Sequence, residues 1–199
     1  MALKFQYNKT ALRDIEKQLN IRLRALPTLK NKESALRIEV KKAKTIVENL
    51  NDQIKQKNNS FRNFSALWCE FDQTLISIKE VKTSTIKIAG VKITVFEDII
   101  FEEKSFNIFS LPVWYFEGIN FVKELLKLQI KKEYAHKMMQ MLETSRRKTT
   151  QKVNLYEKVQ IPTYQTAIRK IKRFLEDEEN LSKASQKIIK KRQTETVEL

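Results

Sequence analysis

Glycine and proline are scarce in this sequence, which has two glycines and three prolines among 199 residues. A compact sheet or a fold with many loops needs more turn-forming residues than that, so both are disfavoured. Lys, Leu, Glu, Ile and Gln are prominent instead, and all of them except Ile rank among the stronger helix formers. The composition therefore predicts long helices.

Side chains that carry catalysis are also rare. The only cysteine, Cys69, excludes an intramolecular disulfide and is typical of a reducing compartment, where we expect an inert, partly buried thiol. The only histidine, His136, excludes a two-histidine metal site and is expected on a helix surface. The acidic run Glu176–Glu179 is typical of a solvated helix face. With no phosphate-binding glycine loop or nucleophile elbow either, the sequence predicts no catalytic, cofactor or metal site.

No apolar run approaches the roughly 20 residues that a membrane-spanning helix needs. The N-terminus also lacks a basic segment followed by an apolar one, the mark of a secretion signal. We therefore expect a soluble, intracellular protein that reaches a membrane only through partners.

Positive charge is the one excess: the formal net charge is +15. Such a balance indicates an acidic partner, which could be nucleic acid, an anionic membrane surface or an acidic protein cavity. Solvated lysines on long helices would give the same number without any partner.

The strongest pattern is a heptad repeat that runs from Phe5 to Ile78 without a slip. It has 22 seam positions, of which 18 are apolar. A strict seven-residue period keeps one seam on one face, as in a left-handed coiled coil. The most regular seam residues are Leu12, Ile15, Leu19, Leu36, Val40, Val47, Leu50 and Ile54. The pattern predicts an N-terminal coiled-coil arm over residues 1–80, with Pro27 expected to kink or break it locally.

A second arm is expected over residues 117–199. Its seam pattern slips by one residue near Pro162 and then continues through Leu181, Ala184 and Ile188. Because the two arms have similar lengths, an antiparallel pair would bring both termini to one tip. The start of the chain would then lie beside residues 180–192.

Between the arms the period changes from seven to two, which predicts a β-hairpin head over residues 81–116. The residues that mark the hairpin are Ile88, Gly90, Val91 and Ile93. A second β-rich stretch follows at Ile99–Phe101, and an aromatic cluster follows that. Because an isolated hairpin is marginal in water, we expect the head to pack on the far end of the coiled coil, against the wide seam of Phe61, Phe64, Trp68 and Phe71. The fold class is mainly α: a long antiparallel two-helix coiled coil with a small β-hairpin-containing head.

Three stretches resemble the D-subunit family of V-type rotary ATPases. They are NKTALRDIEKQL with LPTLKNKESALRIE in the first arm, IAGVKITVFEDIIFEE in the head, and KVNLYEKVQIP followed by KIIKKR in the second arm. The order and spacing of the set, together with the two arms, make the resemblance specific.

The resemblance implies a rotor shaft that carries torque between ATP hydrolysis or synthesis and the transport of protons or sodium ions. It implies a cytoplasmic position on the inner face of the membrane. The implied partners are the hexamer of catalytic A and regulatory B subunits, the small F subunit of the stalk, and the funnel subunit (C or d) on the membrane ring. No direct contact with nucleic acid and no insertion into the membrane are implied.

Basic residues gather at the expected tip, where they would favour an acidic cavity lining. They are Lys4, Lys9, Arg13, Lys183, Lys187, Lys190, Lys191 and Arg192. Charged residues also interrupt the seam, at Arg22, Glu33, Lys132 and Arg146. These either make the shaft asymmetric or extend from the seam into water.

Two other classes of protein stay open. A coiled coil that binds nucleic acid would concentrate its basic residues on one stripe with aromatic side chains free to stack, whereas here they spread over both arms. A membrane-tethering coiled coil would bind liposomes by itself.

Overall fold

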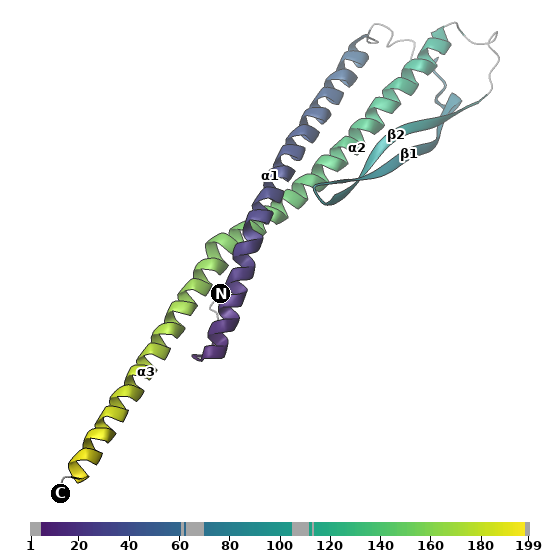
Figure 1. The fold of residues 1–199 in the computed structure, drawn as a ribbon. Coiled ribbons are helices and arrows are strands. Elements are labelled where there is room, and N and C mark those ends of the chain that lie inside the picture. The colour runs from purple at the N-terminus through teal and green to yellow at the C-terminus, as the bar shows by residue number, and fades with distance from the viewer. Residues whose placement is uncertain (1–4, 61, 63–69, 105–111, 113, 198–199) are drawn as a thin grey trace. The chain divides into compact units, whose positions relative to one another are not determined.

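The computed structural model describes residues 5–60, 62, 70–104, 112 and 114–197. Helix α1 (Lys9–Ser60) comes first, followed by a short 3₁₀ turn (Gln73–Leu75) and strands β1 (Ile76–Ile88) and β2 (Val91–Glu103). Helix α2 (Trp114–Asn154), a π-helical turn (Leu155–Gln160) and helix α3 (Ile161–Val197) complete the order (Figure 1). The predicted fold class, two long helical arms with an antiparallel hairpin between them, is confirmed. The chain forms two compact units, residues 32–148 and residues 1–31 with 149–199.

Helix α1 begins at an asparagine cap and ends earlier than the heptad predicts. The Asn8 side chain accepts a 2.6 Å hydrogen bond from the Ala11 N–H, which satisfies a donor that the first turn leaves open. The helix then continues through Pro27 to Ser60 without the break that a proline can cause. At Leu75 and Ile78 the heptad is wrong, because Leu75 lies in the 3₁₀ turn and Ile78 in β1. Leu75 and Ile78 are apolar and three residues apart, a spacing that also occurs where a strand begins. The heptad period alone therefore could not reveal that the helix had already ended.

The hairpin is longer than predicted, with 13 residues in each strand. Ile88 pairs with Val91 across the turn, and the ladder runs to Ile76 opposite Glu103, with two register shifts. Ala89 and Gly90 have φ of 49° and 82°, the left-handed conformation that tight hairpin turns require. The stretch Ile99–Phe101 is therefore not a separate element but part of β2, and β1 begins before the expected head boundary at residue 81.

Within residues 32–148, the turn of the hairpin lies between α1 and α2. Leu36, Ala43, Ile93 and Leu142 form a core in which each side chain is at most 1% exposed. The expectation that the head packs on the far end of the coiled coil is therefore wrong for the turn of the hairpin. The strands are long enough to run back along α2, a span of about 40 Å at 3.4 Å per residue, as Figure 1 shows. The apolar side chains Ile93 and Ile99 of the hairpin are therefore buried against the helices of this unit.

Ion pairs and rings hold β2 along α2 in the same unit. Lys127 bonds Asp98 at 2.6 Å, and this hydrogen bond holds the pKa of the Asp98 carboxyl below its usual range. The rings of Phe96 and Tyr134 lie 6.2 Å apart. Helices α1 and α2 pair antiparallel, because Val47 and Leu50 pack on Ala135 while Lys57 pairs with Glu124.

Aromatic residues mark the start of α2. Phe71 stacks on Tyr115 with ring centroids 5.5 Å apart, and Trp114 lies 4.7 Å from Tyr115. A Cβ on Gly118 would stand 3.2 Å from the Trp114 ring, so a larger residue there would require the ring to shift by a few tenths of an ångström. Phe71 is therefore not a seam residue of α1. The other predicted aromatic and seam positions lie outside the described residues: Phe61, Phe64, Trp68, Cys69, Phe106, Ile108, Phe109 and Leu111.

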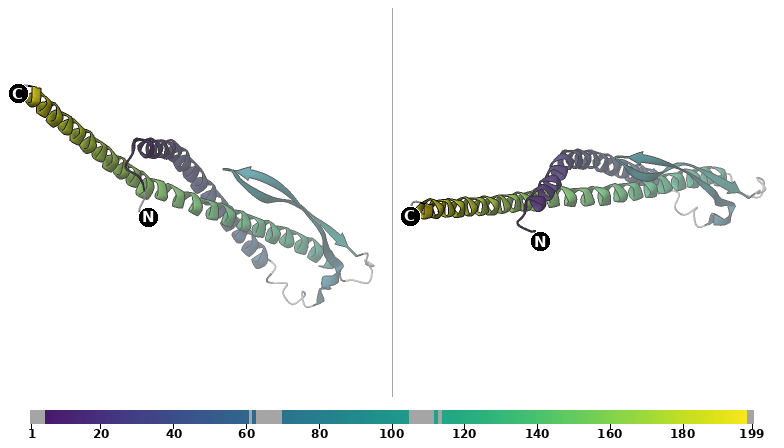
Figure 2. Two further views of the ribbon diagram at one scale, coloured as in Figure 1. Left: turned by 90° about the horizontal axis from the view of Figure 1, so that it is seen from below. Right: turned by 60° about the horizontal axis from the view of Figure 1, so that its bottom comes forward.

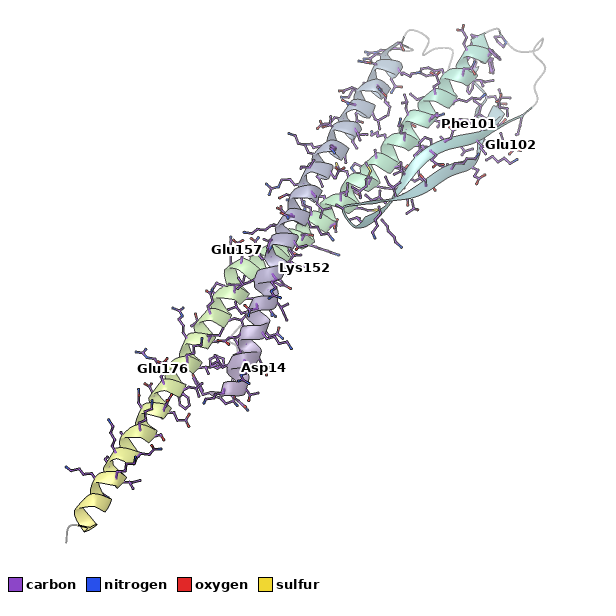
Figure 3. All side chains as sticks on the ribbon, viewed as in Figure 1. Asp14, Phe101, Glu102, Lys152, Glu157 and Glu176 are labelled. Carbon is purple, nitrogen blue, oxygen red and sulfur yellow. The ribbon has the colours of Figure 1, made fainter. Side chains whose placement is uncertain are left out.

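In the other unit, the start of α1 lies antiparallel to the first half of α3. Ile15 packs with Ala167 and Ile171, and the ring of Tyr7 lies 4.9 Å from that of Phe174. Figure 3 labels Asp14 and Glu176 on these paired segments. Helix α3 then continues past the start of α1, as the views in Figure 2 also show. The expectation that the start of the first helix lies beside residues 180–192 is therefore wrong, because Tyr7 meets Phe174 and Lys9 lies near Glu179.

The π-helical turn explains the one-residue slip in the second arm. The Ile161 N–H donates to the Tyr156 carbonyl, five residues back, so the turn holds one residue more than an α-helical turn. Seam positions after it move by one and still face α1. The wider turn also makes room for the ring of Pro162, which would press on the carbonyl of Lys158 in a regular helix.

Candidate functional site

The predicted seam residues lie between paired helices in both units. Ile15 is 7% exposed, and Leu12 packs on the same cluster from the partly buried rim. Leu19 is half-buried on the same helix. In residues 32–148, Leu36 is fully buried and Val40 packs against it. Val47, Leu50 and Ile54 are buried farther along α1.

Arg22, a polar seam position, is held by the π-helical turn rather than extending into water. Its guanidinium carbon lies 4.6 Å from the centre of the Tyr164 ring and 5.9 Å from that of Tyr156. Its Nε donates a 2.6 Å hydrogen bond to Oε1 of Gln160. A cation on the face of aromatic rings is stabilised by their quadrupole. Arg22 thus ties α1 to residues on both sides of the extra turn.

A second charged layer lies at the end of the unit formed by residues 32–148. Glu143 bonds Arg146 at 2.7 Å and Arg147 at 3.0 Å. These hydrogen bonds lower the pKa of the Glu143 carboxyl to about 2. Glu33 pairs with Arg37 at 3.1 Å, and its charge also favours the charged form of Arg146. Glu33 and Arg146 are therefore satisfied by partners near the seam, while Lys132 is half-buried.

Most of the basic residues predicted for the tip lie along α3. Lys9 and Arg13 are exposed at the start of α1, and Lys4 lies outside the described residues. Lys183 bonds Glu179 at 2.8 Å, which lowers the pKa of that carboxyl, and the charge of Lys9 adds to the effect. The remaining tip residues are exposed on α3 past the start of α1: Lys187, Lys190, Lys191 and Arg192.

The same end of α3 exposes large apolar side chains. Leu181 is 70% exposed, and Ile188 and Ile189 are each 55% exposed. Leu181, Ala184 and Ile188 are therefore not seam residues against α1, which corrects the predicted register at this end. We call residues 181–192 the α3 extension. It carries apolar and basic side chains together, a surface suited to a partner rather than to water.

The predicted hairpin residues take different places around its turn. Ile93 is 1% exposed in the core, while Ile88 and Val91 pack on that core from its edge. Gly90 supplies the positive φ of the turn and lies next to Lys32 of α1, whose Nζ would be 3.4 Å from a Cβ placed there.

The described residues offer little for catalysis. Among residues 5–60, 70–104 and 114–197, no group of three or more His, Cys, Asp or Glu side chains could hold a metal ion. His136 and the acidic run Glu176–Glu179 are exposed, as expected of helix surfaces. No helix in this part of the chain is long and apolar enough to cross a membrane.

Comparison with known proteins assigns the chain to a family. The family model for the ATP synthase D subunit matches residues 11–191. The chain is also 31% identical to the D subunit of the V-type ATP synthase of Borreliella burgdorferi over 191 residues, 94% of each protein. It is 27% identical to the subunit of the same name from Chlamydia muridarum, over 96% of this chain and 97% of that protein. This chain belongs to the D-subunit family of ATP synthases.

The family match covers both helical arms and the hairpin, so the resemblance found in the sequence is confirmed. Two features near the seam were not predicted: the contacts of Arg22 with the π-helical turn and the pairing of Glu143 with Arg146 and Arg147. In the α3 extension the basic residues were predicted as part of the tip, but the exposure of its apolar residues was not. The slip near Pro162 signalled the π-helical turn, but nothing in the spacing paired Arg22 with Tyr164, far along the chain. The α3 extension follows only once the pairing of the start of α1 with α3 is known.

Proposed function

We propose that this chain is the central rotor shaft of a V-type ATP synthase. It transmits torque between ATP hydrolysis or synthesis in the catalytic hexamer and proton or sodium transport by the membrane ring, and is not itself a catalyst. The family match over residues 11–191 carries this proposal. The relatives, which are named as D subunits of V-type ATP synthases, match it along nearly their whole length.

The geometry of each unit supports a shaft. Two helices side by side resist twisting and bending better than one, and antiparallel packing of Ile15 on Ile171 and of Leu36 on Leu142 provides that pairing. The charged side chains around Arg22 and Glu143 make the surface of the helix pair differ from one side to another. A shaft that presents different faces to equivalent catalytic sites needs such asymmetry.

The partners follow from the same proposal. The α3 extension, with its exposed apolar and basic side chains, enters the cavity of the hexamer of catalytic A and regulatory B subunits. The small F subunit of the stalk binds the helix pair, and the funnel subunit on the membrane ring receives the opposite end. The chain then works in the cytoplasm on the inner face of the membrane, attached through these partners.

A covalent tether between shaft and hexamer tests the rotor role directly. A photo-crosslinking amino acid at Ile188 is activated in the purified complex, and ATP hydrolysis is measured before and after illumination. Because a shaft that must turn is stopped by a tether, activity should fall in proportion to the fraction of this chain that is linked to the hexamer.

The same amino acid at Leu12 is the matched control. Leu12 packs within the chain against α3, so its crosslinks should stay within the chain and leave hydrolysis intact. Full activity in a complex whose shaft is linked to the hexamer would contradict rotation. Failure of the tagged chain to purify with any other part of an ATP synthase would contradict the proposal as a whole, and nucleic acid in their place would favour a coiled coil that binds nucleic acid.

A further inference from the structure

The turn of the hairpin carries a concentration of like charge that the fold does not explain. Lys87 and Lys92 lie directly opposite each other on β1 and β2, one step from the turn. Directly opposed like charges destabilise a strand pair. Lys32 of α1 reaches the same turn, with its Nζ next to Gly90. All three lysines are exposed.

No acidic side chain compensates these lysines within the part of the chain that the structure describes. The ion pairs there engage Lys30, Lys42 and Lys57 among others, but none includes Lys32, Lys87 or Lys92. The nearest acidic residue of α1, Glu33, is paired with Arg37. By contrast, Lys82 of the same hairpin stands directly opposite Asp98. The like-charge pair at the turn is thus a local exception in its own hairpin.

We propose that Lys32, Lys87 and Lys92, the turn triad, form a docking site for a carboxylate-bearing segment of a partner protein in the complex. The inference rests on the proposed function, which supplies such partners. The hairpin holds the triad in a fixed place, because Ile93 and Val91 anchor the turn in the core between α1 and α2. A rigid turn orders its lysines before binding, so less conformational entropy is lost when they meet an anion.

A protein partner fits the surroundings better than nucleic acid. Thr85 and Thr94, exposed and directly opposite each other, lie farther from the turn on the same strands and extend the surface with hydroxyl groups. Non-specific binding of a nucleic-acid strand needs a longer basic track with aromatic side chains for stacking. The triad is compact, and aspartate and glutamate side chains match its amines.

Charge reversal separates docking from folding. Lys87→Glu or Lys92→Glu replaces a like-charge pair by an opposite-charge pair, so each should raise the melting temperature of the isolated chain or leave it unchanged. Either variant should also weaken association with the complex stripped of this chain, roughly tenfold at low salt. The double variant, with two opposed glutamates, should melt near the wild type but bind most weakly. Lys79→Glu, an exposed lysine elsewhere on β1, is the control and should bind normally.

Zero-length carbodiimide crosslinking of the intact complex then checks the chemistry of the partner. Isopeptide bonds from Lys87 or Lys92 to an aspartate or glutamate of another protein in the complex are expected. If the wild-type chain bound the stripped complex and both reversal variants bound it equally well, the docking site would be overturned while the proposed function stood. Absence of wild-type association would instead contradict the proposed function. If the reversals abolished binding to phosphatidylglycerol vesicles or to polyuridylate but not to the stripped complex, the partner would be a phosphate and the proposal would fail.

Discussion

At the scale of single residues, Ile93 and Ile86 form an informative pair. They lie directly opposite each other on the two strands, yet Ile93 is 1% exposed and Ile86 is 42% exposed. Replacing Ile93 by alanine opens a cavity against Leu36 and Leu142, so the variant should lose about 2–5 kcal/mol of unfolding free energy. Ile86→Ala should lose less than about 1 kcal/mol, since the exposed side chain leaves little cavity behind. Urea unfolding followed by circular dichroism measures both, and equal losses would show that the hairpin turn does not enter the core.

The Glu143 carboxyl gives a pH dependence of known sign. Its pKa falls from 4.5 in the unfolded chain to about 2 in the folded one, because Arg146 and Arg147 bond its charged form. A group whose pKa is depressed by folding stabilises the protein above its unfolded pKa, and this contribution is lost as the pH falls from about 4.5 to 2. Glu143→Gln should be less stable at pH 7, and the difference from the wild type should shrink over that interval. Melting curves at about pH 7, 4 and 3 test this, and a constant difference would contradict it.

Arg22 offers a test of the clamp at the π-helical turn. Its contact with the Tyr164 ring predicts a coupling energy of about 0.5–1 kcal/mol. A double-mutant cycle with Arg22→Met and Tyr164→Leu measures it through unfolding free energies. Since both residues lie in the same unit, a coupling near zero would mean that the guanidinium and the ring do not interact in solution.

At the scale of elements, the π-helical turn predicts an unusual tolerance to deletion. In a Pro162→Ala background, which lacks the ring that the wide turn accommodates, removing the exposed Lys158 takes out one residue where the turn holds one too many, so the flanking helix can become regular with its seam unchanged. Removing the exposed Lys170 from α3 instead rotates Leu175 and the residues after it by about 100° away from α1. The Lys158 deletion should retain most of the melting temperature, and the Lys170 deletion should lose far more. Equal losses would contradict the assignment of the extra residue to the turn.

The sequence predicted some elements better than others. The turn of the hairpin could be predicted because alternation around Ala89 and Gly90 is a local signal. The seam of α1 could be predicted up to Ile54, because a heptad reports on one face of one helix. The end of α1 could not, since Leu75 and Ile78 happen to continue the period after the helix has stopped. The return of the hairpin onto α1 depends on contacts far apart in the chain, which no local pattern encodes.

The hairpin is therefore better seen as part of the folded core than as a separate module. A separate module in place of the hairpin could be exchanged for a short linker over Ser84–Lys104 without loss of stability. With Ile93 and Ile99 buried, the structure indicates the opposite. Because Ile93 shares a core with Leu36 and Leu142, we expect changes in the head to affect the packing of the helix pair as well as any docking surface that the head carries.

At the scale of the whole molecule, we expect the α3 extension to contribute little to stability but much to function. Truncation after Asn180 removes the α3 extension, whose side chains are exposed, so the isolated chain should melt within a few degrees of the wild type. If the extension transmits torque in the hexamer, the truncated protein should uncouple ATP hydrolysis from ion transport. Both are measurable, by calorimetry of the chain and by ATP-driven pumping in reconstituted vesicles.

Neutralising the five basic residues Lys183, Lys187, Lys190, Lys191 and Arg192 is the matched comparison. Exposed ion pairs are weak, under about 1 kcal/mol each, and a bearing that must turn tolerates only such contacts. This variant should therefore pump better than the truncated one. Equal loss in the two would mean that charge, and not the shape of the helix end, makes the contact.

The exposed end of α3 also has a consequence for the life of the newly made chain in the cell. Leu181, Ile188 and Ile189 present apolar surface beside lysines until a partner protein covers them, and such segments are recognised by chaperones and cut by proteases. Surplus copies without a partner should be degraded, so the amount of this chain would follow the supply of its neighbours. Under this expectation, the uncovered end of α3 would act as a quality control that lets only assembled copies persist.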